Sequence, residues 1–344
     1  MLIYFRTVTD RPSFFIDKTI PLWFNINNRK TKKEQNMEHK LRKTSIVCIL
    51  AMVCCILWGS AFPCIKIGYS LFEIPAGDTA SQILFAGLRF TLAGILAWIF
   101  GSLIAKKPML PEKEAYGKIA LLSLFQTVLQ YLFFYVGLAH TTGVKSSVIK
   151  GADVFICILF SALIFKLEKL TPKKIIGCVI GMAGVIIINL AGGSIDMNIT
   201  FLGEGFIVLS MFAHTMSSVL IKIFSKNHNP VMLSSFQFTL GGIVMTLCGL
   251  IFGGTLPQVT AKGVMMLIYL ALVSSVAYSL WSVLLKYNPV SRISVFGFMN
   301  PVFGVILSAI LLGEMEQAFS LNAVIALALI CTGIIIVNKT AKTE

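Results

Sequence analysis

The chain has 344 residues, of which 56% are hydrophobic and only 13% are charged. Soluble globular domains carry about 25% charged residues, so this composition excludes a soluble domain and indicates a protein of the lipid bilayer. The formal net charge of +14 does not indicate nucleic-acid binding, because the basic residues lie between apolar runs and not among base-stacking aromatic residues.

The chain begins with a basic tail, residues 1–44, before the first apolar run. Within it, residues 1–36 lack the apolar core of about 7 to 15 residues that a secretory signal requires, and we expect them to be disordered. Met37 opens a short basic lead-in that resembles the start of a membrane protein. We therefore hypothesise that the native chain starts at Met37 and that residues 1–36 result from a start codon assigned too early. The mass of the native N-terminus tests this hypothesis.

Ten apolar runs follow the tail. Each has about 19 to 26 residues, which as a helix rising 1.5 Å per residue crosses a hydrocarbon core of about 30 Å. The sequence therefore predicts an all-α membrane protein with ten transmembrane helices. The runs cover residues 45–70, 80–104, 117–139, 144–165, 172–191, 201–224, 231–252, 262–285, 292–313 and 320–338.

The second run contains a segment that recurs in the seventh. Residues 88–95 (LRFTLAGI) return 148 residues later as residues 236–243 (FQFTLGGI). This predicts two repeats of five spans each, residues 45–192 and 193–344, the second ending in a short C-terminal tail. Because five is odd, the second repeat is inverted across the membrane, an arrangement of secondary transporters that bind substrate between the repeats near the midplane.

Lysine and arginine residues are unevenly divided between the two ends of the spans. The side that holds the N-terminus receives 17 of them, and the other side receives only Lys66, Lys145 and Lys262. The positive-inside rule therefore predicts that both termini are cytoplasmic.

Several short motifs resemble a known family. They are residues 57–62 (LWGSAF), 88–90 (LRF), 300–303 (NPVF), 312–314 (LGE) and 333–335 (GII). In this order within ten spans they resemble the EamA family of the drug/metabolite transporter (DMT) superfamily. The resemblance implies a ten-helix bundle, in a bacterial inner membrane, that moves small organic solutes, often amino acids and often outward. Span 4 departs from the pattern, because Asp153 stands where the second repeat has Pro301.

Three charged residues lie within the predicted spans. Arg89 and Asp153 each lie nine residues in from the outer side, at a depth of about 13 Å, and Lys150 precedes Asp153 by one helical turn. Charges at such depth are functional candidates unless they are paired. One interpretation is a structural ion pair between Arg89 and Asp153, with Lys150 snorkelling outward. The other interpretation is a cavity in which the cations hold a substrate carboxylate and Asp153 holds a substrate ammonium group. We prefer both to a role for Asp153 as a proton carrier, because nearby cations favour the charged form of a carboxylate and make its protonation harder.

Polar and aromatic residues of other spans complete the candidate substrate-binding or gating set. They are more often packing residues than recognition residues, although buried amides and hydroxyls need partners that a wet cavity supplies. These further candidates are Gln126, Gln130, Tyr131, Gln237, Tyr278, Trp281 and Asn300.

Breaks in two spans suggest places that bend. Trp58, Gly59, Ser60 and Pro63 are expected to interrupt span 1, and residues 297–304 to interrupt span 9. At the ends of spans 4 and 9, Glu168 and Glu314 are expected to be interfacial and structural.

No pattern points to an enzyme. The eight cysteines contain no CxxC pair and the four histidines are scattered, so no metal site, disulfide framework or cofactor is indicated. No Walker segment indicates ATP drive. We expect a secondary exporter of small polar metabolites such as amino acids, whose partners are that solute, the bilayer, and a coupling proton or ion. The alternatives are another organic anion, sugar or drug-like solute, or a lipid-handling or scaffold protein, and the oligomeric state stays open.

Overall fold

The computed structural model describes residues 32–75, 77–141, 146, 149–190, 200–312 and 321–340. These residues form helices and, within those ranges, no strands. The chain divides into two units, Met1–Lys40 and Leu41–Glu344, and the long apolar helices belong to the second. The expected disorder of residues 1–36 is wrong for its last part, because helix α1 (Lys32–Arg42) begins there on Lys, Glu and Gln, which favour helices. The rest of that expectation lies outside the described residues.

Seven stretches of the described chain are long and apolar enough to cross a membrane, so this is a multi-pass membrane protein of helices. They correspond closely to seven of the ten predicted runs. The predicted fifth and tenth runs are helical as well, in α8 (Pro172–Leu190) and α15 (Leu321–Thr340). The start of the fourth run lies outside the described residues, so the count of ten stays a prediction. The seven stretches are Thr44–Leu71, Thr79–Ala105, Lys113–Ala139, Phe201–Phe224, Pro230–Ile251, Ala261–Tyr287 and Val290–Leu311.

Some of these stretches are single α-helices and others change their winding on the way. The unbroken ones are α2 (Thr44–Leu71), α3 (Thr79–Ala105), α10 (Pro230–Ile251) and α11 (Ala261–Tyr287). The composite ones join α-helix to short π or 3₁₀ segments: η2 (Lys113–Ala115), α4 (Tyr116–Ser123), η3 (Leu124–Leu129) and α5 (Gln130–Ala139); η5 (Phe201–Gly205) and α9 (Phe206–Phe224); α12 (Val290–Ser294), η6 (Val295–Phe298) and α13 (Met299–Leu312). The fourth predicted run, which is not among the seven stretches, likewise contains α7 (Asp153–Leu159) and the π segment η4 (Phe160–Ile164).

Side chains that cap free backbone N–H groups set where three of the long helices begin. Asp78 accepts from the Ser81 N–H before α3, Asn229 accepts from the Val231 N–H before α10, and Thr260 accepts from the Gly263 N–H before α11. Pro230 adds a preset backbone angle at the first turn of α10. Short polar residues between apolar runs therefore define the ends of the spans.

The two expected breaks have different outcomes. Span 9 changes to a 3₁₀ turn at η6, around Gly297, but Pro301 and Gly304 lie inside the continuous helix α13, so the interruption expected over residues 297–304 is found only at its start. Span 1 does not break, because α2 runs from Thr44 to Leu71 with Pro63 inside it. Neighbouring helices support α2 through this region, since it packs along α11 and α13, and membrane helices tolerate proline when neighbours replace the lost bond. The expected interruption of span 1 is therefore wrong.

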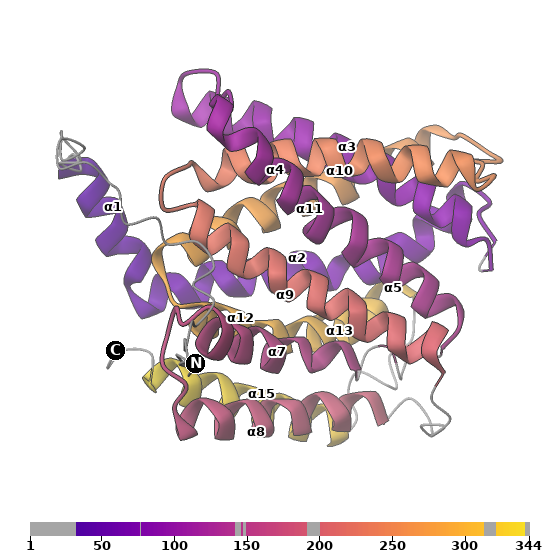
Figure 1. Cartoon of the computed structure of the whole chain (residues 1–344). Coiled ribbons are helices and arrows are strands. Elements are labelled where there is room, and N and C mark those ends of the chain that lie inside the picture. Colours follow the sequence, from indigo (N-terminus) through magenta and orange to yellow (C-terminus); the bar gives the residue numbers. More distant parts are fainter. Residues whose placement is uncertain are drawn as a thin grey trace, which may run out of the picture. The chain divides into compact units, whose positions relative to one another are not determined.

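Helices pair across the two halves of the chain in a regular way (Figure 1). Helix α3 lies along α10, and α8 lies along α15. Helix α2, in the first predicted run, packs against α11 and α13, in the eighth and ninth. Helix α9, in the sixth predicted run, packs against α5 and α7, in the third and fourth. The first run of each predicted repeat therefore packs against the third and fourth runs of the other repeat.

The α3 and α10 helices touch backbone to backbone through glycines. A Cβ added to Gly249 would lie 2.6 Å from the Leu84 backbone nitrogen, and one added to Gly94 would overlap the Thr239 backbone. In the same way Gly242 lies against Thr91. The residue numbers of the contacts increase along α3 while they decrease along α10, so the two helices are antiparallel. Small residues permit this approach in the absence of a strong hydrophobic drive between helices in lipid.

Candidate functional site

An aromatic cluster lies where α3, α5, α10 and α11 meet. The hydroxyl oxygens of Tyr131 and Tyr278 are 2.8 Å apart, and the rings of Phe90 and Phe238 stack with centroids 5.4 Å apart. The two tyrosines are 147 residues apart in sequence and the two phenylalanines 148, which is the spacing of the predicted repeat. Each pair therefore joins residues at equivalent positions of the two halves.

Arg89 lies at the edge of this aromatic cluster and is 4% exposed. Its guanidinium carbon is 4.3 Å from the ring centroid of Phe90 and 6.0 Å from that of Tyr131. Its Nε has no hydrogen-bond partner among the described residues. The ring faces stabilise the cation, while part of its hydrogen-bonding capacity is left for another group.

Two tryptophans extend the aromatic cluster. The Trp58 ring lies 5.0 Å from that of Tyr278 and 4.9 Å from that of Trp281, edge to face in both cases. Both indole N–H groups are buried and find no acceptor in the described part of the chain. Trp281 is one of the predicted residues, whereas the sequence identifies Trp58 only as part of an expected break in span 1. An indole usually finds a hydrogen-bond partner when buried, so these two donors mark the region as a binding candidate.

The predicted amides have buried polar atoms on η3, α5, α10 and α13. Gln237 is fully buried and its Oε1 accepts from the Thr127 hydroxyl at 2.8 Å, which leaves its Nε2 without a partner within the described ranges. The side-chain oxygens of Gln126, Gln130 and Asn300 are buried and unpartnered in the same sense. Each such atom costs about 1–3 kcal/mol unless water or a ligand bonds to it.

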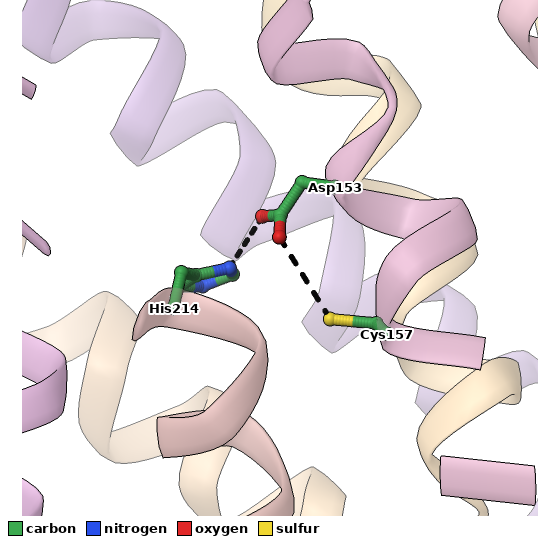
Figure 2. Close-up of side chains that lie close together, drawn as sticks. All are labelled: Asp153, Cys157 and His214. Atoms are coloured by element: carbon green, nitrogen blue, oxygen red, sulfur yellow. Dashed lines mark hydrogen bonds and ion pairs between the residues drawn. The ribbon is translucent and has the colours of Figure 1, made fainter. Parts of the chain in front are cut away.

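A second group, the carboxylate cluster, consists of Asp153, Cys157, His214 and Thr215 on α7 and α9, and Figure 2 shows the first three of these side chains. Asp153 Oδ2 is in ion-pair contact with His214 Nδ1, and Asp153 Oδ1 accepts from the Thr215 hydroxyl at 3.1 Å. Cys157 Sγ is 4.0 Å from Asp153 Oδ1 and 3.2 Å from Thr215 Oγ1. Asp153 is 9% exposed and Cys157 1% exposed, so the cluster is largely screened from solvent.

The expected pairing of Arg89 with Asp153 is not what the structure contains. No ion pair joins them in the described residues, and the partner of Asp153 is His214. Lys150 also has other partners, since its Nζ donates to Ser210 Oγ at 3.4 Å and lies 5.8 Å from the Phe134 ring centroid. Arg89 and Asp153 therefore have different partners, and Lys150 lies near enough for its charge to act on Asp153 without pairing with it.

His214 and Cys157 were missed as partners of Asp153. The spacing of Asp153 and Cys157, one helical turn, already placed them on one face. His214 lies 61 residues further on, and one sequence gives no sign of which helix faces which. Its position inside an apolar run was the available signal, because an ionisable residue there is a functional candidate.

Glu168 is structural, as expected, and more deeply involved than an interfacial residue. Its Oε1 accepts from the Ser161 hydroxyl at 2.6 Å and the Ser291 N–H at 2.9 Å, and its Oε2 pairs with Lys174 Nζ at 3.0 Å. It thus ties the end of η4 and the start of α8 to α12. Its expected counterpart, Glu314, lies outside the described residues.

Comparisons with known proteins agree on one family and one fold. The profile of the EamA-like transporter family matches residues 45–190 and 201–339. An "Uncharacterized transporter" of Archaeoglobus fulgidus is 28% identical over 82% of this chain and 95% of its own. A "Probable amino-acid metabolite efflux pump" of Escherichia coli is 25% identical over 77% of this chain and 87% of its own. A solved crystal structure has a similar fold, with a TM-score of 0.71 at 18% identity over 88% of this chain and 99% of that one.

Proposed function

Because the chain belongs to the EamA-like transporter family, we propose that it is a secondary exporter of small polar metabolites such as amino acids. The relatives named above are called transporters, and one is named a probable amino-acid metabolite efflux pump. We assign it to a bacterial inner membrane on its similarity to a bacterial efflux pump, and we place both termini in the cytoplasm on the distribution of Lys and Arg.

The proposal includes two inverted repeats, residues 45–192 and 193–344. Inversion requires that equivalent helices of the two halves run antiparallel, and α3 and α10 do so. Residues that lie beside a two-fold axis between the repeats meet their equivalents, and the pairs Tyr131–Tyr278 and Phe90–Phe238 support such an axis. In inverted-repeat transporters the substrate lies beside such an axis, near the midplane.

The substrate site we propose is the aromatic cluster together with Asp153. Arg89 would hold a substrate carboxylate, since its charge rests on ring faces and is not neutralised by an acid in the described residues. Asp153 would hold an ammonium group, because it is a buried carboxylate that forms no ion pair with a lysine or arginine in the described residues. The unpartnered amide and indole groups supply further bonds. The observation that carries the assignment is this set of buried, unpartnered polar atoms, contributed by both halves of the chain, together with the buried cation Arg89.

Transport by the purified protein in liposomes tests the proposal. A panel of amino acids and organic acids is offered with and without a proton gradient, and empty liposomes are the baseline. We expect uptake of at least one zwitterionic amino acid, and a loss of about tenfold or more in Arg89→Gln, in line with a charge-assisted bond of about 1.5–3 kcal/mol.

The matched control is Lys262→Gln, which removes an exposed cation at the start of α11 and should transport normally. Absence of uptake of every solute by folded protein would overturn the proposed function. Normal transport by Arg89→Gln would overturn the assigned site and leave the function standing.

A further inference from the structure

The carboxylate cluster brings together three kinds of metal-ligand atom. An Asp153 carboxylate oxygen, the Cys157 sulfur and a His214 ring nitrogen all lie within 4.8 Å of one another. They come from two helices, α7 in the first half of the chain and α9 in the second (Figure 2). We propose that these three residues bind a divalent transition-metal ion of the zinc class, and that the bound ion blocks transport.

The donor set matches this class of ion. Zn²⁺ accepts carboxylate oxygen, imidazole nitrogen and thiolate sulfur at about 2.0–2.3 Å, whereas Ca²⁺ and Mg²⁺ take oxygen ligands almost exclusively. Around a tetrahedral ion with those bond lengths, neighbouring ligand atoms are about 3.3–3.7 Å apart. The 4.0 Å separation of Cys157 Sγ from Asp153 Oδ1 is close to this range, so small side-chain rotations complete the site.

The surroundings fix the orientation of two ligands. The Thr215 hydroxyl lies 3.1 Å from Asp153 Oδ1 and 3.2 Å from Cys157 Sγ, and thereby holds the carboxylate and the sulfur toward the same point. Partners of this kind, which bond to the ligands and not to the ion, typically change metal affinity by about 10 to 100-fold. Lys150, one turn before Asp153, is directed to Ser210 and to the Phe134 ring, so no ion pair with it occupies the carboxylate.

Three protein ligands leave a fourth position of the tetrahedron for water or a substrate group. The side chain of His214 is 22% exposed, against 12% for that of Asp153, and it gives the ion its approach. An ion bonded to α7 and α9 at once joins the two halves, and it occupies the carboxylate assigned to the substrate ammonium group. The blocking effect rests on the proposed function, whereas the binding does not.

Cobalt is the spectroscopic probe for the site. The full-length protein, purified without metal in detergent, is titrated with Co²⁺, which in a tetrahedral site with sulfur gives strong visible bands and a sulfur-to-cobalt charge-transfer band. We expect one equivalent to produce both, Zn²⁺ to abolish them, and Cys157→Ser to lose the charge-transfer band. Cys178→Ser is the matched control, because Cys178 is also 1% exposed but belongs to no such cluster in the described residues.

A conservative variant keeps the test valid if a ligand variant misfolds. Thr215→Val retains all three ligands and should keep the charge-transfer band with an affinity about 10 to 100-fold weaker. The metal site is overturned if the wild-type protein gives no such band, or if the band persists in Cys157→Ser.

Transport assays separate this proposal from the proposed function. Zn²⁺ should inhibit uptake by wild-type protein and by Cys178→Ser, and a chelator should restore it. Cobalt binding without uptake of any solute would reject the transport function and retain the metal site. Uptake without cobalt bands would reject the metal site and retain transport.

Discussion

At the scale of single residues, Arg89 and Asp153 are buried charges with different supports. Arg89 rests on the rings of Phe90 and Tyr131, while Asp153 bonds to His214 and Thr215. Their burial follows from the sequence, because the number of residues from the end of a span gives depth at 1.5 Å per residue. Their partners do not follow, because depth says nothing about the direction in which a helix faces. Equal depth therefore suggested a pair that the helices do not form.

The charge of Asp153 is testable with an isosteric change. We expect Asp153→Asn to transport at least about tenfold more slowly, since an amide lacks the charge-assisted bond of about 1.5–3 kcal/mol to an ammonium group. The measurement is initial uptake in liposomes, normalised to folded protein.

Asp78→Asn serves as the control for that exchange. Asn caps a helix as well as Asp does, so this variant should transport normally. Full activity of Asp153→Asn would remove Asp153 from the proposed substrate site.

Asp78 makes helix α3 sensitive to acid. The hydroxyl and the backbone N–H of Ser81 donate to its carboxylate and hold the pKa of Asp78 below its ordinary value. The folded state thus binds the proton more weakly than the unfolded state, so the cap stabilises fully above about pH 4 and is lost as the pH falls through the lowered pKa.

Removing this cap should therefore destabilise the protein most above that pH. We expect Asp78→Ala to lower the free energy of unfolding by about 0.5–2 kcal/mol at neutral pH, and by less in acid. Thermal unfolding in detergent at several pH values measures the difference. A penalty that does not change with pH would show that the carboxylate charge is not the cause.

At the scale of elements, the long helices were predictable and their internal winding was not. Apolar length and polar caps such as Asn229 and Thr260 fix where a span begins. By contrast, Pro63 lies inside an unbroken α2, because α11 and α13 pack along it and support the continuous helix. The π segment at Leu124–Leu129 gives no sequence signal either. Both depend on neighbours that a single sequence does not identify.

The glycine contacts between α3 and α10 are a sharp test of helix packing. We expect Gly94→Ala to lower stability by about 1–3 kcal/mol, because the new methyl group overlaps the Thr239 backbone. Gly117→Ala is the control: it lies in a helix with nothing within 4 Å of a Cβ and should stabilise by about 0.4–1 kcal/mol. Thermal unfolding of both in one detergent checks the pair, and equal effects would mean that the close approach is absent.

At the scale of the whole molecule, the doubling was readable from residues 88–95 and 236–243, and the family from motifs such as residues 57–62. The contact between Tyr131 and Tyr278 could not be predicted, since the sequence identifies them only as candidate residues on separate spans. Repeat spacing identifies equivalent residues, but whether they touch depends on where the axis between the halves passes. That position requires three-dimensional packing.

The orientation in the membrane is testable with single cysteines. We expect Glu73→Cys, in the exposed connection after α2, to react with an impermeant maleimide in intact cells. Lys113→Cys, exposed in the next connection, should react only after the membrane is permeabilised. The wild-type chain with its eight native cysteines gives the background. The reverse pattern would place the termini outside.

The Tyr131–Tyr278 contact also bears on how such a chain could arise. In a symmetric dimer a residue on the two-fold axis meets its own copy, and every contact of residue i with residue j is repeated as j with i. The stacked phenylalanines and the contacts Gly94–Thr239 and Thr91–Gly242, which exchange under the repeat spacing, have this form within one polypeptide. Under the proposed inversion, the chain has the form of an interface between two copies of one half, and a gene of half the length, inserted in both orientations, would have encoded both sides of it.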